Sequence, residues 1–500
     1  MGGVVSWIVS NRKLRLEAYW EIFTAVQETT PPIKIAPGTS FKITMRLRST
    51  KAPTGIHWPA MFFGADAEIL AMLCQLQLAE RWPADVLQHA QRTQLTALLE
   101  HTIRTVPFYA ARLRMRTTQD MKHAVENTDR WQQIPILTRE HIQTHGKDMR
   151  SDSYPPSHGR THLKQTSGST GQPVEVLRTD LTQRYWEAAA LREHTWNQRD
   201  ASLGCAVIRA LTPDAPAPHG LKLDTWGYPY DRLWRTGHTH TLNLATDIAT
   251  QADWLRSIKP AYLLTYPTNA AALLNEFAKG EPPPLKEIIC LGEPISDTLV
   301  ESCRAILGAR VSANYSSQEA GYLAILCPDC GQYHVQSESV LLEVLDAEGR
   351  PCQRGITGRV VITDLHNFAM PLIRYELGDY AEVGGACSAG RTLLSLKRIL
   401  GRQRNMVLHP DGGRHWPLTG FARFSEVAPI RQYQFVQHGR TAIEVRLVAD
   451  VTLTPLHQAA LAEIIHAALG YTFELEFTQH AQRLDRGAGG KFEEFVCLAQ

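Results

Sequence analysis

Residues 166–173 read Thr166-Ser-Gly-Ser-Thr-Gly-Gln-Pro173, a run rich in glycine and hydroxyl groups that precedes the strand-like segment Val174-Glu-Val-Leu177. Gly168 and Gly171 allow the backbone to turn sharply and to approach an anion closely. Four side chains add hydroxyl donors to the backbone N–H groups of such a loop: Thr166, Ser167, Ser169 and Thr170. A Walker-type loop would need Gly-Lys-Ser/Thr opening a helix. We therefore expect a phosphate-binding loop between two strands, with an ordinary polar turn as the alternative.

On the C-terminal side of this loop, short β-rich runs alternate with helical stretches. The β-rich runs are 205–208, 262–265, 288–291 and 359–363, and the helical stretches lie near 181–197, 268–279 and 295–308. This alternation predicts an α/β architecture with sheets covered by helices. We expect it to form a large, multi-layer N-terminal domain over residues 61–400.

The first sixty residues differ from the rest because they show no sustained helical or strand period. Helical spacing begins after Met61 and continues to about residue 118, with Leu95, Leu98 and Leu99 on one face. Pro107 should end the long helix, since proline lacks a backbone donor. We expect a native start near Met61, with residues 1–60 a poorly ordered or non-native extension. A genuine small N-terminal element is the alternative.

After about residue 400 the pattern becomes that of a smaller α+β unit. Strands are expected near 432–437, 442–449 and 472–478, a helix near 455–469, and a glycine-rich tail at the end. We interpret residues 401–500 as a small, mobile C-terminal lid domain.

Composition limits the classes of function. The 52 Lys and Arg residues nearly balance the 50 Asp and Glu residues, so charge gives no reason to expect a nucleic-acid partner. No apolar stretch approaches the roughly 20 residues of a membrane span. The nine scattered cysteines favour reduced thiols in a cytoplasmic protein over a disulfide framework. The sequence does not determine the oligomeric state, and a homodimer is one assembly that it allows.

Several separated runs occur in a characteristic order. They are Arg104–Tyr109, Ile134–Thr138, Gly292-Glu293-Pro294, Tyr315–Glu319, Met370–Asp379, Gly401-Arg402 and Gly490-Lys491-Phe492. Together with the loop at 166–173, this order resembles the adenylate-forming (acyl-CoA synthetase-like) superfamily. Within it, the chain is similar to the phenylacetate–CoA ligase and coenzyme F390 synthetase family over roughly residues 65–500.

The resemblance implies a site for ATP and Mg²⁺. It implies that the loop from Thr166 to Gly171 holds the β- and γ-phosphates. It places adenine between Tyr315 and the Gly292–Pro294 turn, which includes Glu293. It assigns Mg²⁺ to Glu319, a carboxylate of the kind this hard cation prefers. It assigns the nucleotide contacts Asp379, Arg374 and Arg402, of which Asp379 accepts from the ribose hydroxyls.

The resemblance also assigns the catalytic lysine of adenylation to Lys491, which follows the glycine-rich run Arg486-Gly-Ala-Gly-Gly490. A lysine on such a loop can move in and out of a site as a lid closes and opens. Two positions depart from the family pattern. Gln172 stands where the loop often has Lys, and Arg404-Asn405 replace an acidic pair after Gly401-Arg402.

Cys327-Pro-Asp-Cys330, with His334 nearby and Cys387 farther along, has the residue types of a structural zinc site. Relatives often carry a second cysteine pair near position 387, but this chain has Cys387-Ser-Ala-Gly390. Either His334 supplies the missing ligand, or the site no longer binds metal.

The resemblance implies an AMP-forming acid–thiol ligase. ATP would activate an aromatic or other small carboxylic acid to an acyl-adenylate, and CoA would be the acceptor. One alternative is transfer to a non-CoA acceptor in a polysaccharide or natural-product pathway. The other is a catalytically quiet nucleotide-binding protein, against which the presence of Glu319, Asp379 and Lys491 argues.

Overall fold

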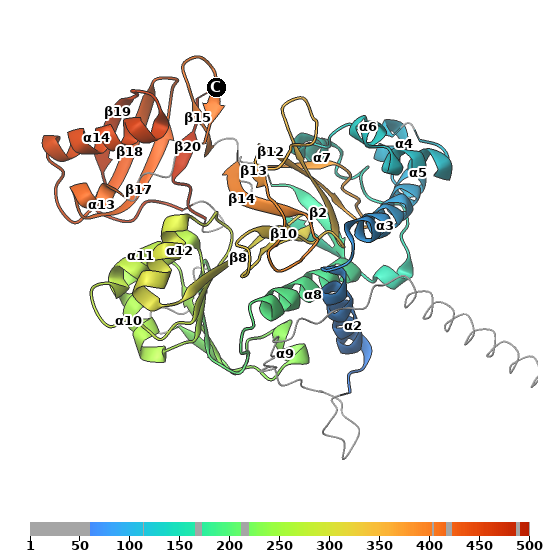
Figure 1. The fold of residues 1–500 in the computed structure, drawn as a ribbon, viewed down its shortest axis with the longest axis horizontal. Coiled ribbons are helices and arrows are strands. Elements are labelled where there is room, and N and C mark those ends of the chain that lie inside the picture. The colour runs from blue at the N-terminus through green and yellow to red at the C-terminus, as the bar shows by residue number, and fades with distance from the viewer. Residues whose placement is uncertain are drawn as a thin grey trace, which may run out of the picture. The chain divides into compact units, whose positions relative to one another are not determined.

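The computed structural model describes residues 61–113, 115–165, 173–211, 220–402, 405–416, 423–486 and 491–499. The predictions for residues 1–60, for the loop at 166–172 and for Arg404 and Gly490 therefore lie outside the described residues. Figure 1 shows the order of the elements along the chain.

Helices dominate the first hundred described residues, as predicted. Leu95, Leu98 and Leu99 are buried on one face of α3. This helix ends at Thr105, and Pro107 begins the next one, where its missing N–H costs no hydrogen bond. The helices are α2 (Gly64–Ala79), α3 (Ala84–Thr105), α4 (Pro107–Arg112), α5 (Thr118–Glu126), α6 (Thr128–Gln132) and α7 (Arg139–His145).

A β-hairpin surrounds the glycine-rich run. Strands β1 (Thr161–Gln165) and β2 (Glu175–Thr179) pair antiparallel, with Gln165 opposite Glu175. The prediction that the run connects two strands is confirmed. A short 3₁₀ turn, η1 (Pro156–His158), precedes the hairpin. Helix α8 (Asp180–Trp196) follows directly and packs on α2 and β9.

The described strands of the central sheet number twelve, in the order β11-β12-β13-β14-β10-β9-β8-β7-β6-β3-β5-β4. In the half from β8 to β4, strands alternate with helices, as the sequence predicted, and the strands are parallel except for β4, which is antiparallel to β5. Figure 1 shows α10, α11 and α12 side by side. The elements of this half are β3 (Cys205–Arg209), β4 (Leu221–Leu223), α9 (Tyr230–Leu233), β5 (Thr239–Asn243), α10 (Ile248–Ile258), β6 (Tyr262–Thr265), α11 (Pro267–Phe277), β7 (Glu287–Cys290), α12 (Asp297–Leu307) and β8 (Arg310–Ser317).

The other half of the sheet is antiparallel. Its strands are β9 (Gly321–Leu326), β10 (Tyr333–Val335), β11 (Val340–Leu345), β12 (Thr357–Asp364), β13 (Tyr375–Val383) and β14 (Ser395–Arg402). One hydrophobic core runs through both halves and includes residues from Leu95 to Leu396. Strand β8 joins the halves, because it is parallel to β7 and antiparallel to β9.

The C-terminal part has a sheet and a core of its own. Phe435, Val445, Leu461, Ile465 and Phe495 belong to this second core. The predicted strands and helix are confirmed, but the tail adds β20, which pairs parallel with β17. The elements are β15 (Val407–Leu408), β16 (Arg414–His415), α13 (Phe424–Val427), β17 (Ile430–Gln437), β18 (Ala442–Ala449), α14 (Pro455–Leu469), β19 (Glu474–Gln479) and β20 (Phe495–Cys497).

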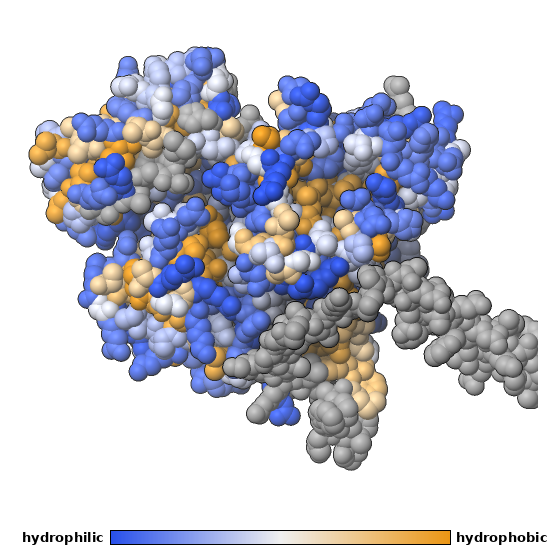
Figure 2. All heavy atoms as spheres, in the orientation of Figure 1, coloured by the Kyte–Doolittle hydropathy of each residue, from blue (hydrophilic) through white to orange (hydrophobic). Residues whose placement is uncertain are grey.

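The fold is therefore a large α/β unit followed by a small α+β unit, and the predicted fold class is confirmed. Hydrophilic residues predominate on the face shown in Figure 2, where apolar residues also appear. None of the described helices combines the length and the apolar character needed to cross a membrane.

Candidate functional site

Three predicted nucleotide contacts from separate strands meet in the structure. Tyr315 lies on β8, Asp379 on β13 and Arg402 at the end of β14, directly opposite Asp379. The Tyr315 hydroxyl donates to Asp379 Oδ2 at 2.9 Å, and Arg402 Nε lies 3.6 Å from Asp379 Oδ1. A carboxylate has about four lone-pair sites, so Asp379 can still accept from a ligand. Burial, reinforced by the charge of Asp379, raises the pKa of Tyr315, which keeps it a neutral donor.

Glu319 lies in the turn between β8 and β9 and is 7% exposed. The Tyr375 hydroxyl approaches Glu319 Oε1 at 3.5 Å, a long hydrogen bond. Within the described part of the chain, no Lys or Arg forms an ion pair with Glu319 inside 4.0 Å. A buried carboxylate with so few protein partners is suited to a cation ligand, since buried charges are normally paired or metal-bound. The geometry fits the predicted Mg²⁺ position without showing a metal there.

Lys491 lies against the Gly292 turn, although the two are far apart in sequence. Gly292 follows β7 with a φ of +77°. A Cβ at this position would lie 3.2 Å from Lys491 Cε and 3.4 Å from a ring carbon of Tyr266. Glycine is therefore required here both for its backbone conformation and for the close approach of the lysine.

The Glu293 side chain binds the segment that carries Lys491, and its predicted nucleotide contact stays a prediction. Its Oε1 accepts from the Phe492 N–H at 2.6 Å and from Arg486 Nη1 at 3.2 Å. Its Oε2 accepts from the backbone and hydroxyl of Thr268, at 3.1 and 2.8 Å. Arg486 also donates to the Thr268 hydroxyl at 2.8 Å. Burial raises the pKa of Glu293, and these donors oppose the shift. We call these four residues the Glu293 cluster.

The hydrogen-bond and ion-pair partners described for Arg374 are not among the other residues predicted to bind the nucleotide. Arg374 is 1% exposed and adopts a φ of +50°. Its guanidinium pairs with Glu343 at 3.1 Å and donates to the carbonyls of Gln132 and Ile134, at 2.8 and 2.7 Å. These contacts hold the segment that precedes α7 against the sheet. A nucleotide contact for Arg374 stays a prediction, and the phosphate loop lies outside the described residues.

The predicted metal ligands do come together. One potential ligand atom from each of Cys327, Cys330, His334 and Cys387 lies within 4.8 Å of the other three. Cys330 Sγ lies 3.4 Å from His334 Nε2, and the other ring nitrogen of His334 contacts the Leu393 carbonyl at 3.2 Å. Such a carbonyl contact orients an imidazole for metal binding.

The partners of Glu293 were not predicted from the sequence. Arg486 stands in the glycine-rich run before Lys491, so its position pointed to the lysine loop, but nothing in the pattern linked it to Thr268. A second group of buried residues, around Arg178, Asp364 and His366, belongs to no motif recognised in the sequence. Their burial, rather than their spacing, distinguishes them.

Comparison with known proteins agrees with the fold. No family model matches the chain. A phenylacetate–coenzyme A ligase of Thermus thermophilus is 24% identical over 363 residues, which cover 67% of this chain and 75% of that protein.

Two solved structures of a 2-hydroxyisobutyryl-CoA ligase share the fold. One, in the postadenylation state with R3-HIB-AMP, aligns with a TM-score of 0.66 and 16% identity, over 84% of this chain and 91% of that one. The other, an open conformation with 2-HIB-AMP and CoA, aligns with a TM-score of 0.54 and 17% identity, over 84% and 93%. The chain is therefore similar in sequence to a phenylacetate–coenzyme A ligase and has the fold of a 2-hydroxyisobutyryl-CoA ligase.

Proposed function

We propose that this chain is an AMP-forming ligase that activates a small carboxylic acid with ATP and transfers the acyl group to CoA. In the first step a carboxylate oxygen of the acid attacks the α-phosphorus of ATP, and pyrophosphate leaves. In the second step the thiol sulfur of CoA attacks the acyl carbon, its proton is lost, and AMP leaves. The observation that carries this proposal is the grouping of Tyr315, Asp379 and Arg402, together with Lys491 against the Gly292 turn.

Each residue has a chemical task in the proposed reaction. Tyr315 and the Gly292–Pro294 turn would flank adenine, and Asp379 would accept from the ribose hydroxyls. Mg²⁺, held by Glu319, would neutralise the charge that develops on the phosphates. The loop at 166–171 would donate to the β- and γ-phosphates, with Arg402 close to the nucleotide.

Lys491 would stabilise the negative charge shared by the acid and the α-phosphate. An ammonium group aimed at developing charge in a water-excluded site is an effective source of rate acceleration. The Glu293 cluster supports this role, because the Phe492 N–H that Glu293 holds is adjacent to Lys491. CoA must reach the adenylate afterwards, so we expect the cluster to open between the two steps.

The test is ATP–pyrophosphate exchange with a panel of carboxylic acids, followed by thioester detection with and without CoA. Acid-dependent exchange together with CoA-dependent thioester formation is the expected result. Exchange without thioester would instead support a non-CoA acceptor. ATP binding without exchange across the panel would contradict the ligase function and favour a quiet nucleotide-binding protein. Sedimentation of the same sample distinguishes a monomer from the homodimer that the sequence allows.

We also propose that Cys327, Cys330, His334 and Cys387 bind a structural Zn²⁺ ion. Tetrahedral bonds of about 2.0–2.3 Å place ligand atoms roughly 3.5–3.8 Å apart, close to the spacing of this cluster. The ligands come from the β9–β10 turn, from β10 and from a loop before β14, so the metal would tie these segments together. Elemental analysis of protein purified without added zinc should give one zinc per chain, and Cys330→Ser should lower it. A metal-free, equally stable protein would contradict the proposal.

A further inference from the structure

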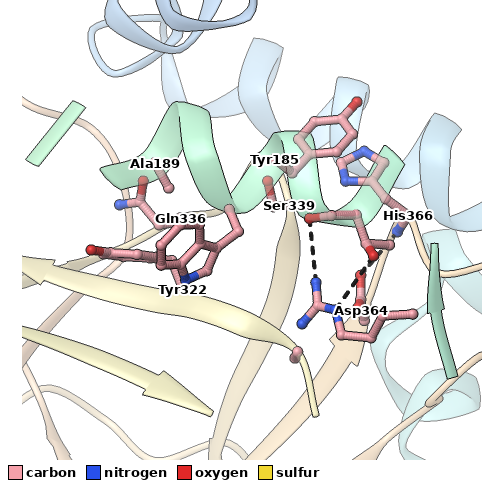
Figure 3. A pocket seen from close by; sticks show the side chains of 11 residues that line it. Tyr185, Ala189, Tyr322, Gln336, Ser339, Asp364 and His366 are labelled. Atoms are coloured by element: carbon pink, nitrogen blue, oxygen red, sulfur yellow. Dashed lines mark hydrogen bonds between the residues drawn. The ribbon is translucent and has the colours of Figure 1, made fainter. Parts of the chain in front are cut away.

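A pocket lies between helix α8 and strands β2, β9 and β12, and Arg178, Asp364 and His366 line it. It is a small, partly open hollow, and its roughly 300 Å³ of empty space includes open solvent. Figure 3 shows Asp364, His366 and Tyr185, the last from α8, at one end and Gln336 and Tyr322 at the other. Arg178 comes from β2.

Asp364 and His366 have buried polar atoms without partners in the described structure. Asp364 is 4% exposed, and its Oδ1 accepts from the His366 backbone at 3.1 Å, but its Oδ2 has no partner. His366 stacks on Tyr185 with ring centroids 3.7 Å apart, and its Nδ1 has no partner. Burial lowers the pKa of His366 to about 3, so the ring is neutral.

Arg178 likewise has few hydrogen-bond partners among the described residues. It is 8% exposed, and within the described residues its guanidinium donates two long hydrogen bonds, both to Thr182 at 3.4 Å. No carboxylate of the described residues lies within 4.0 Å of its guanidinium. Burial lowers the pKa of Arg178, and the charges of Asp364 and Glu319 oppose that shift, so the cation is retained. Buried donors and acceptors are nearly always satisfied in native proteins, so Asp364 Oδ2 and His366 Nδ1, which have no partner among the described residues, require an explanation.

The pocket borders the proposed adenylation site. Ala320, next to the proposed Mg²⁺ ligand Glu319, is part of its wall. Gly321, which follows, has a φ of +80°, and a Cβ there would lie 3.1 Å from Arg178 Nη1. Only glycine allows the guanidinium to pack directly on this turn. An acid whose carboxylate sits near Glu319 could therefore extend its other end into the pocket.

The polar groups define what that end must be. Arg178 can donate to an acceptor, and the Asp364 carboxylate can accept from a donor at Oδ2. A hydroxyl or a carboxamide group supplies both an acceptor and a donor. A second carboxylate would face Asp364, an ammonium would face Arg178, and an apolar ring would leave Asp364 Oδ2 and His366 Nδ1 unpaired.

We infer that this pocket is the subsite for the far end of the acid, and that it selects acids bearing an uncharged hydroxyl or carboxamide group there. This inference rests on the proposed ligase function and refines its substrate class.

The test compares matched acids in ATP–pyrophosphate exchange. The pairs are 4-hydroxyphenylacetate and phenylacetate, 4-hydroxybutanoate and butanoate, and succinamate and pentanoate. We expect at least one polar acid to exceed its apolar partner in kcat/KM by about 100-fold or more, because a site built to hydrogen-bond a group rejects the analogue that lacks it. Arg178→Met and Asp364→Asn should reduce that ratio to about fivefold or less. Arg350→Met and Asp346→Asn, in an exposed turn, serve as matched controls and should retain it.

The ratio of kcat/KM for the polar acid to kcat/KM for the apolar acid distinguishes selection from a general loss of activity, since a structural defect lowers the activity with both acids equally. If Arg178→Met does not fold, Asp364→Asn alone decides the outcome. Equal exchange with polar and apolar partners would overturn the inference, indicate a pocket filled by water only, and leave the ligase function intact. If none of the acids supports exchange, both the inference and the proposed ligase function are overturned.

Discussion

Glu293 and Asp364 are both buried carboxylates next to an arginine, but their surroundings differ. Glu293 accepts four hydrogen bonds, from Thr268, Arg486 and Phe492. Asp364 Oδ2 accepts none from the described residues, and its arginine, Arg178, makes no ion pair within 4.0 Å there. Burial raises the pKa of both carboxyl groups.

The difference separates two uses of a buried charge. A satisfied carboxylate fixes the position of the groups around it, whereas an unsatisfied one destabilises the free protein and gains a partner only with a ligand. We interpret the Glu293 cluster as positioning the lysine loop, and the Asp364 pocket as prepared for substrate. The following predictions test this distinction.

The largest effect is expected from Lys491→Ala, which removes the charge that the Glu293 cluster positions. ATP–pyrophosphate exchange should fall by about 10²–10³-fold, the usual loss when one group that stabilises the transition state is deleted. ATP binding, measured by calorimetry, should persist. Lys279→Ala, which changes an exposed lysine just after α11, is the control. Unchanged exchange would remove Lys491 from the mechanism.

Glu293→Gln should lower exchange by about 10–100-fold, because the lysine loop loses its anchor and a displacement of about 1 Å is costly for catalysis. Transfer of a preformed acyl-adenylate to CoA should change little, since that step does not use Lys491. Glu301→Gln, exposed on α12, is the control. Equal losses in both half-reactions would indicate a general structural defect.

The same residue predicts a pH dependence. Protonation removes the acceptor capacity that the cluster uses, and burial raises the pKa of Glu293 above its usual range. Exchange should therefore decline as the pH falls through that raised pKa, at a higher pH than an exposed glutamate would cause. The acid limb should be absent from Glu293→Gln, whose residual activity has no carboxyl group at this position. If the acid limb of the pH profile is unchanged in Glu293→Gln, another titrating group causes it.

Asp364→Asn should raise the unfolding free energy of the ligand-free protein by about 1 kcal/mol, because a buried, unpaired charge is replaced by an amide. Since the folded state raises the pKa of Asp364, it binds the proton more tightly than the unfolded state. The wild-type protein should therefore lose this component of stability as the pH rises through the folded pKa. Glu293→Gln should lower the unfolding free energy instead. Denaturant unfolding of both variants measures these unfolding free energies. A lower unfolding free energy for Asp364→Asn than for the wild-type protein would contradict the prediction.

The smallest effect is expected from Tyr315→Phe. The change removes one hydrogen bond to Asp379 and leaves the ring, so the KM for ATP should rise about fivefold, equivalent to about 1 kcal/mol. Tyr471→Phe, in the C-terminal part, is the control. A loss comparable to that of Lys491→Ala would mean that the hydroxyl has a further role.

Local patterns predicted much of this structure. Alternating β-rich and helical runs located β3, β6, β7, α11 and α12 because strand and helix periods depend on neighbouring residues. The hairpin at 161–179 followed from glycines next to a strand-like segment. Strand β20 was missed, since three residues of a tail carry too little pattern to identify a strand.

The sequence by itself determined the fold class, the order of the motifs and the residue types of the site, because these depend on local spacing and composition. Only the tertiary structure decided which of those residues meet. Glu293 binds Phe492 and Arg374 binds Glu343 because packing brings distant segments together, and no local period encodes such a contact. The unpaired atoms of Asp364 and His366 are likewise invisible in sequence, since the lack of a partner is a property of the packed chain.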